Sequence, residues 1–508
     1  MNTDNGNIDL EVTNFGPIVE AKINLRPLTI FVGPSNTGKS YLAILIYALH
    51  RFFDQGANFL SPDYRRRFSI WQRFMSSRKL SNNTMEGIIE LARSLTKENK
   101  ISPSNSTIVL PESVAKFIQS SLNKNNDGLA CEIIRCFGIS EIKSLTRKQS
   151  QCAARIVTRR RMLPESYPLE NTLTFTQQNK FNMIVPNGVP IPIEINGNSR
   201  SDRNLYKIAE IVESLNIKNN DRGSNKFALI DFMDSIVGKI LPSLLGSLHL
   251  PAYYLPADRT GIMHAHNVVV SALITAATSA GIRPTSKTPM LTGVLADFMD
   301  QLIELSYERK RIKKDLAIDI EKHMLGGSVH IQEDAINNYP HFVYRPNNWQ
   351  SNLALANASS MVSELAPIVL YLRHIVVSGN VLIVEEPESH LHPAMQVEFI
   401  RQLSVLVNKG IRIIVTTHSE WLLEELANIV RRSELPESEL KRGANHDVKL
   451  RPDQVGTWLF EMKNRPKGTK VKQILLDDSG LYPSGYDEIA IDLHNDWAKI
   501  TGLLQATP

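Results

Sequence analysis

Residues 33–40 read Gly-Pro-Ser-Asn-Thr-Gly-Lys-Ser and match the pattern G-x-x-x-x-G-K-[ST] at every position. In such a loop the glycines let backbone N–H groups turn inward around phosphate oxygens, and the helix that follows adds its dipole. Lys39 would neutralise the β- and γ-phosphate oxygens, and the Ser40 hydroxyl would ligate Mg²⁺. The predicted nucleotide-binding residues are Gly33, Pro34, Ser35, Asn36, Thr37, Gly38, Lys39, Ser40 and the adjacent Tyr41.

Two adjacent glutamates, Glu385 and Glu386, follow the apolar segment 381–384, which has the composition of a buried strand. Hydrolysis of a bound triphosphate needs one carboxylate near Mg²⁺ and another that polarises the attacking water. Ligands gather at the carboxyl ends of strands in open α/β sheets. The pair therefore fits the demand that the phosphate-binding loop creates; the alternative is a pair of solvated glutamates that merely ends a strand.

Two further segments offer contacts to a phosphate. The strand-like segment 411–416 leads to His418, which could hydrogen-bond a γ-phosphate oxygen or the attacking water, although a single histidine at a strand end is often structural. Ser359 and Ser360 open a predicted helix over 361–377, and a capped helix N-terminus binds anions. As a helix cap alone, this pair of serines is commonplace.

His390 and His392 raise the competing possibility of a transition-metal site. An H-x-H pair on a strand places both imidazoles on one face, but Pro393 is expected to open a helix, so both histidines fall in a turn. No cysteine is nearby to complete a ligand set. The sequence favours a role for these histidines in shaping the turn or in contacting a partner subunit.

The elements that must position these residues are those of an α/β domain interrupted by a long insertion. Alternating or continuous apolar patterns predict strands, and a 3.6-residue period, with Pro at the start and Gly past the end, predicts helices. Strands are expected at 8–13, 19–25, 28–32, 249–259, 381–384 and 411–416, and helices at 41–53, 266–282, 290–322, 361–377 and 393–409. The predicted organisation is 1–53 and 246–430 for the two parts of the α/β domain, 54–245 for a mainly helical insertion with short strands at 164–200, and 431–508 for a C-terminal extension.

The composition is that of a soluble protein of two or three domains, with 508 residues, 42% apolar and 21% charged residues and a net charge of +5. Three scattered cysteines indicate reduced thiols, and the polar N-terminus does not resemble a signal peptide. Apolar runs stop short of the roughly 20 residues that a membrane span needs. We expect a cytoplasmic protein without a membrane segment.

Dense positive charge is confined to the runs 65–67, 159–161 and 309–314. Such runs most often form a solvated face, and contact with DNA or RNA phosphates is the alternative. The tail 481–505 has an amphipathic helical pattern, which would pack on its own domain or dock a partner.

Taken in order, the loop 33–40, the stretch VLIVEEPESHLHP at 381–393 and VTTHS at 415–419 resemble the ATP-binding-cassette type of ATPase found in RecF- and SMC-like proteins. They look closest to the OLD-like AAA ATPases of bacterial anti-phage defence systems. The resemblance implies an ABC-type P-loop ATPase head with a mixed sheet, which binds ATP and Mg²⁺. Too few residues follow His418 for the nuclease domain of full-length OLD-like proteins. The chain thus resembles the separate ATPase component of Septu- and PARIS-type systems.

The resemblance also implies a role for each residue. Lys39 and Ser40 would hold phosphates and Mg²⁺, Glu385 would take the Mg²⁺ position, where transporter-type cassettes have Asp, and Glu386 would be the catalytic base. His418 would be the switch histidine. Ser359 and Ser360 stand where the signature motif would be and would contact the γ-phosphate of a second copy, although no glycine pair follows them.

The function implied is that of a homodimeric or larger homo-oligomeric ATPase that serves as sensor and scaffold for a separate nuclease or toxin effector, with DNA as a possible ligand. One alternative is a RecF- or SMC-like DNA repair ATPase, which would bind DNA in an ATP-dependent way. A second alternative is a nucleotide-locked scaffold with negligible turnover. A transporter subunit fits less well, because the LSGGQ signature is absent and the insertion is large.

Overall fold

The computed structural model describes residues 7–54, 81–98, 106–123, 126–147, 153–162, 167–175, 180–193, 200–215, 223–265, 291–305, 316–333, 340–436, 448–465, 467–476, 480 and 494–499. The chain divides into two units. Unit 1 comprises Met1–Gly16 and Leu45–Ala252, and unit 2 comprises Pro17–Ile44 and Tyr253–Pro508. The loop 33–40 and the segments around Glu385 and His418 all belong to unit 2.

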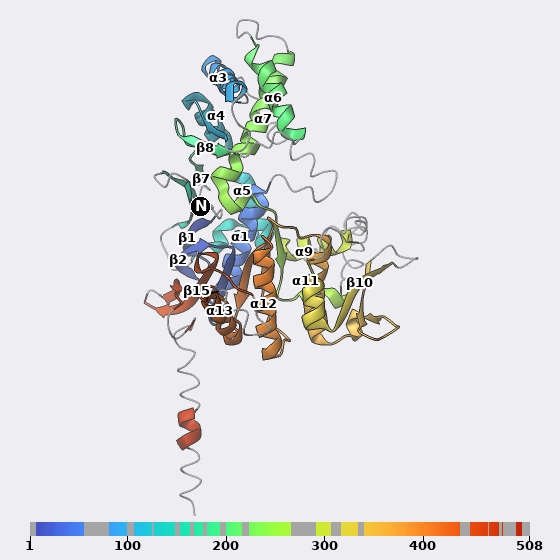
Figure 1. Ribbon diagram of the computed structural model, residues 1–508. Helices are drawn as coiled ribbons and strands as arrows, with labels where there is room; N and C mark the ends of the chain where they lie inside the picture. The colour runs from blue at the N-terminus through green and yellow to red at the C-terminus, as the bar shows by residue number, and fades with distance from the viewer. Residues whose placement is uncertain are drawn as a thin grey trace, which may run out of the picture. The chain divides into compact units, whose positions relative to one another are not determined.

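Unit 2 is built on a mixed sheet (Figure 1). Its strand order is β2 (Ile18–Leu25), β16 (Lys467–Ile474), β15 (Val455–Asn464), β3 (Leu28–Val32), β14 (Arg412–Thr417), β13 (Val381–Glu385) and β9 (Ala252–Leu255). β3 runs parallel to both β14 and β15, and β14 runs parallel to β13, whereas β15 and β16 are antiparallel. Every residue of β3 and β13 is buried, as expected for parallel strands covered on both faces.

Helices of unit 2 supply the apolar cover of this sheet and begin at chemically defined residues. α11 (Ser360–His374) starts after Ser359, α12 (Pro393–Asn408) after His392 and α13 (Glu420–Arg432) after Ser419, and in each case the preceding side chain accepts an N–H from the first turn. Gly410, with a φ of 86°, follows the end of α12. These caps set where each helix begins relative to the strand before it.

The remaining elements of unit 2 correct one prediction. The described part of the predicted helix 290–322 is α9 (Gly293–Glu304), then α10 (Ile318–Ile320) and the π-helical turn η5 (Glu321–Leu325). A small antiparallel sheet follows, formed by β10 (Gly327–Glu333), β11 (Pro340–Pro346) and β12 (Leu353–Ala354). The predicted helix 266–282 lies outside the described residues.

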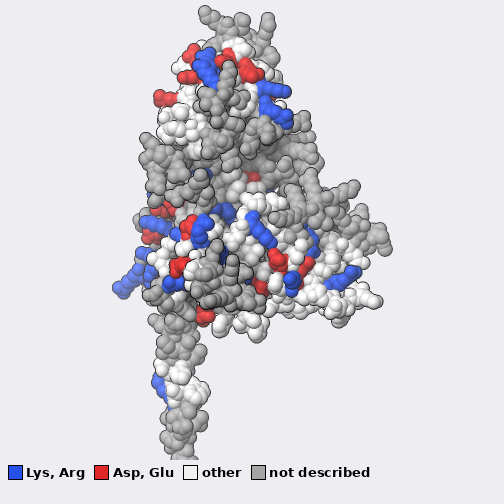
Figure 2. Space-filling view, viewed as in Figure 1, with Lys and Arg blue, Asp and Glu red and all other residues white. Residues whose placement is uncertain are grey.

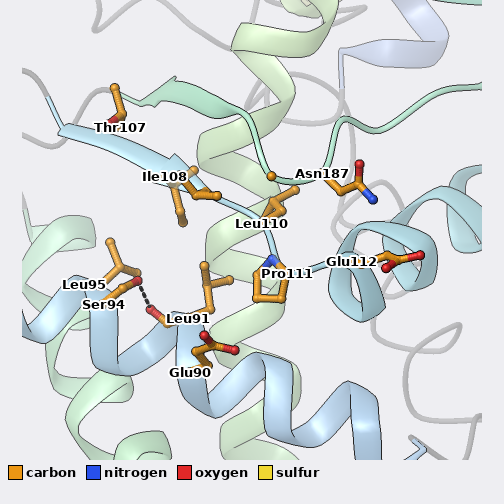
Figure 3. A pocket seen from close by; sticks show the side chains of 12 residues that line it. Glu90, Leu91, Ser94, Leu95, Thr107, Ile108, Leu110, Pro111, Glu112 and Asn187 are labelled. Atoms are coloured by element: carbon orange, nitrogen blue, oxygen red, sulfur yellow. Dashed lines mark hydrogen bonds between the residues drawn. The ribbon is translucent and has the colours of Figure 1, made fainter.

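Unit 1 combines antiparallel strands with helices. β7 (Lys180–Met183), β6 (Tyr167–Phe175), β5 (Ala154–Met162) and β1 (Ile8–Phe15) pair in that order. The helices are α3 (Asn82–Glu98), α4 (Glu112–Asn123), α5 (Asn126–Phe137), α6 (Arg200–Glu213) and α7 (Gly223–Leu245). Strand β4 (Ser106–Val109) pairs with β8 (Pro190–Ile193), and a pocket of about 580 Å³ lies between α3, β4 and the loop residues Asn187 and Gly188, as Figure 3 shows. Helix α1 (Lys39–Phe53) begins in unit 2 and ends in unit 1.

The basic run 159–161 lies on β5, and two of its arginines bind neighbouring residues. Arg159 forms a 2.8 Å ion pair with Glu11 on β1, and Arg160 donates a hydrogen bond to the carbonyl of Pro242. On the face seen in Figure 2, Lys and Arg are interleaved with Asp and Glu. These contacts favour the solvated-face interpretation for this run, and nucleic-acid binding stays a prediction. The runs 65–67 and 309–314 lie outside the described residues.

No helix within the described ranges is long and apolar enough to cross a membrane. The tail is described only at residues 494–499, which are helical and exposed, with the His494 and Trp497 rings stacked on each other.

Candidate functional site

The loop between β3 and α1 has a backbone that only glycine can follow at two positions. Gly33 has a φ of 142° and Gly38 a φ of 97°, both in the region that L side chains avoid. A Cβ on Gly33 would lie 2.5 Å from the carbonyl oxygen of Phe460, and one on Gly38 would lie 2.6 Å from Cγ of Pro17. Asn36, with a φ of 61°, is of the residue types that tolerate this region best.

Lys39, the first residue of α1, folds back over this loop. Its Nζ donates to the carbonyls of Gly33 and Pro34, at 2.9 Å each, and lies 3.1 Å from Nε2 of His418. Burial lowers the pKa of Lys39 to about 8, against the opposing attraction of nearby glutamates. The ammonium group is thus held at the mouth of the loop, where phosphate oxygens would be expected.

Glu385 ends β13 beside the loop. Burial raises the pKa of Glu385, and the hydroxyls of Ser40 and Tyr254 and the N–H of Ala257 partly offset this effect. Its Oε1 is buried and makes no hydrogen bond of normal geometry within the described part of the chain. A buried carboxylate oxygen with spare acceptor capacity beside a serine hydroxyl is the donor set that Mg²⁺ uses, so these residues fit that ion.

Glu386 is oriented by its main chain. It has a φ of 41°, unusual for a residue with a side chain, and its N–H donates to the carbonyl of Thr416 at 2.9 Å. The carboxylate Oε1 lies 3.5 Å from Nε2 of His418, and this neighbour lowers the pKa of Glu386. The carboxylate is partly exposed and ionised at neutral pH, which suits a group that accepts a proton from water.

Glu388 is a residue of this cluster to which the sequence assigns no role. One of its carboxylate oxygens accepts the backbone N–H of His418, so it holds the segment that follows β14. Burial raises the pKa of Glu388. The sequence offered a weak signal, since Glu388 is a third carboxylate close to Glu385 and Glu386.

Arg259 is the second residue of this cluster to which the sequence assigns no role. Its guanidinium group is fully buried and donates to the carbonyls of Pro256, Glu385 and Glu386 and to the carboxylate of Glu364 on α11. An arginine buried with this many acceptors on separate elements fixes their relative positions. Neither the burial of Arg259 nor its hydrogen-bond acceptors can be predicted from one sequence.

Three other predicted site residues, Ser359, Ser360 and Tyr41, are exposed. Ser359 caps α11 by accepting the N–H of Val362 at 3.3 Å, and both Ser359 and Ser360 are exposed. Within the described residues, no hydrogen bond or ion pair connects them to Lys39, Glu386 or His418.

The histidines of the turn support the structural interpretation. The His392 ring accepts the N–H of Ala394 and so caps α12, and the exposed His390 has a φ of 61° in the turn before it. Among the described residues, no group of three or more His, Cys, Asp or Glu side chains could hold a metal ion. The turn accounts for both histidines without a transition metal.

A glycine-rich loop with a folded-back lysine, acidic strand ends and a histidine on the neighbouring strand define an ABC- or SMC-like P-loop ATPase head of α/β fold with a mixed sheet. A family profile described as an AAA ATPase domain (AAA_15) matches residues 8–423, which is most of the chain. The chain therefore belongs to the AAA_15 family of AAA ATPase domains. No curated protein matches it.

Solved structures similar to this chain are SMC heads. A head bound to the C-winged helix domain of ScpA aligns with 11% identity and a TM-score of 0.39 over 93% of this chain and 98% of that chain. The SMC head domain from Thermotoga maritima aligns with 12% identity and a TM-score of 0.35 over 92% and 98%. A head with an extended coiled coil, bound to the C-terminal domain of ScpA from Pyrococcus furiosus, aligns with 10% identity and a TM-score of 0.35 over 96% and 98%. These low scores carry no residue role across to this chain.

Proposed function

We propose that this chain is a Mg²⁺-dependent ATPase in which Lys39 binds the β- and γ-phosphates and Glu386 is the catalytic base. The observation that supports it best is the contact of Lys39 Nζ with His418 Nε2 at 3.1 Å. His418 Nε2 also lies 3.5 Å from Oε1 of Glu386. Three residues widely separated in sequence thus meet at the carboxyl ends of parallel strands. Ser40 and Glu385 would hold Mg²⁺, which supplies charge neutralisation for the phosphate oxygens when bound.

In this proposal the attacking water loses its proton to Glu386 as the new bond to the γ-phosphorus forms and the bond to the ADP oxygen breaks. The lowered pKa of Glu386 keeps the carboxylate ready to accept that proton at neutral pH. His418 hydrogen-bonds the γ-phosphate and senses its loss, and Lys39 neutralises charge on the oxygens. The glycines of the loop, at 33 and 38, leave room for the phosphates against the backbone N–H groups.

Ser359 and Ser360 enter the proposal through their exposure at the N-terminus of α11. A helix N-terminus that presents hydroxyls and N–H groups is suited to a phosphate, and within the described residues no hydrogen bond joins these serines to the loop 33–40. We infer that these serines meet the γ-phosphate held by a second copy, so that ATP closes a homodimer. In the anti-phage role that we favour, this closure would retain a separate nuclease or toxin effector and hydrolysis or a trigger would release it.

Glu386→Gln tests the enzymatic part of the proposal. The amide keeps the size of the side chain but cannot accept the proton, so we expect kcat for phosphate release to fall by about 10²–10⁴-fold while ATP still binds. Lys39→Ala should instead weaken ATP binding, as measured by calorimetric titration. Glu434→Gln is the matched control, because Glu434 is exposed at the end of α13 and should leave both quantities unchanged.

The outcomes separate the candidate functions. Unchanged phosphate release in Glu386→Gln would remove Glu386 as the base. A protein that binds ATP through Lys39 but releases no phosphate would be a nucleotide-locked scaffold. ATP-dependent DNA binding by a purified homo-oligomer, with no effect of an adjacent nuclease or toxin gene on phage plaques, would favour the DNA repair alternative over defence.

A further inference from the structure

Arg259 is the largest fully buried side chain among the described residues, and its surroundings explain why a charge is kept there. Nη1 donates to the carbonyl of Pro256 at 2.9 Å and to that of Glu385 at 2.5 Å, and Nε donates to the carbonyl of Glu364 at 3.3 Å. Nη2 donates to the Glu364 carboxylate and lies 3.4 Å from the carbonyl of Glu386. Every nitrogen of the guanidinium group therefore has an acceptor.

A buried ion pair of this kind is not an obvious source of stability. Desolvation costs several kcal/mol per ion, and an apolar pair of similar volume often serves as well or better. The guanidinium group contributes geometry that an apolar side chain cannot supply, since its planar fork binds several acceptors in fixed directions. The acceptors here are the consecutive carbonyls of the two glutamates at the end of β13.

The contact fixes the main chain of Glu386 from both sides. Its N–H is bound by the carbonyl of Thr416 on β14, and its carbonyl is approached by Arg259. The residue has a φ of 41° between these anchors, a conformation that persists only where the surroundings hold it. The direction of the Glu386 carboxylate, and its 3.5 Å separation from His418, follows from that conformation.

Arg259 also contacts α11, the helix whose N-terminus carries the exposed Ser359 and Ser360. Glu364 lies in the second turn of α11 and is buried, with Arg259 on one carboxylate oxygen and the Thr260 hydroxyl on the other. The preceding residue, Ser363, is bound to His264 at 3.0 Å. The segment that follows β9 thus joins the start of α11 to the end of β13.

We propose that Arg259 is a positioning residue for ATP hydrolysis, which orients Glu386 through its main chain and ties that orientation to the N-terminus of α11. The inference rests on the proposed function, because it assumes that Glu386 is the base. Within the described residues Arg259 makes no hydrogen bond to the loop 33–40, so we expect its loss to act on turnover and not on ATP affinity. A shift of about 1 Å in the base is enough to lower a rate by about 10²-fold.

The test is Arg259→Lys with Arg373→Lys as matched control. Lysine keeps the buried positive charge but cannot bind Glu364 and both carbonyls at once. Arg373 also lies in unit 2, is largely buried, and bridges the Glu321 carboxylate and the carbonyl of Val329 away from the site. We expect Arg259→Lys to lower kcat by about 10²-fold with an unchanged Kd for ATP, whereas Arg373→Lys changes neither.

Two further variants keep the test decisive if Arg259→Lys folds poorly. Arg259→Met combined with Glu364→Leu replaces the ion pair by apolar side chains of similar size and should fold, yet it should show the same loss of kcat. Arg259→Lys combined with Glu386→Gln should release phosphate no more slowly than Glu386→Gln alone, because both act through one carboxylate. Additive losses would mean that Arg259 acts elsewhere.

The outcomes distinguish this inference from the function beneath it. If the wild-type protein hydrolyses ATP and Arg259→Lys, checked as folded by its thermal midpoint, keeps the wild-type kcat, the positioning role is overturned and the proposed function stands. If the wild-type protein releases no phosphate even in a single turnover with excess enzyme, the proposed function fails and the role of Arg259 falls with it.

Discussion

Removing the carboxylate of Glu364 should destabilise unit 2 far more than removing an exposed acidic partner. Glu364 is 1% exposed and Arg259 is 0% exposed, so Glu364→Ala leaves a guanidinium charge in a dry site without its counter-ion. The Thr260 hydroxyl loses its acceptor as well. Breaking a buried pair by removing one partner costs about 3–5 kcal/mol. We expect a loss of this size in the free energy of unfolding.

Asp319→Ala is the control for this experiment. Asp319 pairs with Lys409 at 2.9 Å in the same unit, but the two side chains are 43% and 33% exposed. Solvent screens such a pair, and its loss should cost only about 0–1 kcal/mol. The comparison therefore isolates burial from the mere presence of an ion pair.

Urea unfolding followed by tryptophan fluorescence provides the measurement. Of the 5 tryptophans, Trp71 alone falls in the sequence of unit 1, and Trp458, which is buried, lies on the central strand β15 of unit 2. The signal thus reports mainly on the unit that carries the pair. The midpoint should fall in Glu364→Ala with little change in the slope, since the surface exposed on unfolding stays the same.

The double variant with Arg259→Met and Glu364→Leu completes the argument. An apolar pair in the same space removes the uncompensated charge, so most of the stability lost in Glu364→Ala should return. A loss below about 1.5 kcal/mol in Glu364→Ala, or a double variant no more stable than the single one, would refute the description of a dry, paired site.

Two other predictions concern the loop. Gly38→Ala should abolish ATP binding in a calorimetric titration, because its Cβ would lie 2.6 Å from Pro17, whereas Gly379→Ala, at a φ of 90° with nothing within 4 Å, should leave ATP affinity unchanged. Lys39 has a pKa of about 8, so ATP affinity should weaken as the pH rises above that value and the ammonium form is lost. The measurement is proton uptake on ATP binding at alkaline pH, seen as a dependence of the binding heat on the ionisation enthalpy of the buffer. An ATP affinity that does not change with pH would contradict the prediction.

Much of the nucleotide site could be predicted because its elements are local and strongly patterned. The continuous apolar runs of β3 and β13, together with Pro393 and Gly410 around α12, match the elements predicted from the sequence. The glycine positions of the loop followed from the motif, and the structure gives the reason in the φ values of Gly33 and Gly38.

The strands β15 and β16 could not be predicted in the same way. Their last halves are rich in lysine and partly exposed, as in EMKNRPKGTKVKQ, and this pattern reads as surface. Only the first half of β15 is fully buried, where it pairs with β3, a strand more than 420 residues earlier in the chain. Pairing over such a separation leaves no local pattern in the sequence.

Arg259 and Glu388 illustrate the corresponding gap at the site. Arg259 lies 126 residues from Glu385 and 105 residues from Glu364 in the chain, so nothing local marks these residues as partners. A charged residue is normally expected at the surface, and burial with a full set of acceptors is a property of the fold. Residues proposed to contact phosphate are easier to recognise in the sequence than the residues that hold them in place.

The carboxyl groups around the loop differ in their readiness to act as a base. Burial raises the pKa of Glu364, Glu385 and Glu388, whereas the neighbouring His418 lowers the pKa of Glu386. Environments that push the pKa values of neighbouring acids apart assign them different tasks. Of these four, Glu386 has the lowered pKa and a side chain that is 38% exposed, which favours it over the buried Glu385 as the acceptor of a proton.

The place of Arg259 is consistent with that division. A guanidinium group paired directly with the Glu386 carboxylate would lower its pKa further and make it a poorer proton acceptor. Arg259 instead pairs with Glu364 and contacts Glu386 only at the main-chain carbonyl, so its charge lowers the pKa of Glu386 less than the contact with His418 does. The base is thereby held in position without a counter-ion of its own on that side. If a guanidinium group did pair with the Glu386 carboxylate, we would expect two effects. The pKa seen in the acid limb of the kcat profile would fall, and kcat itself would fall as well.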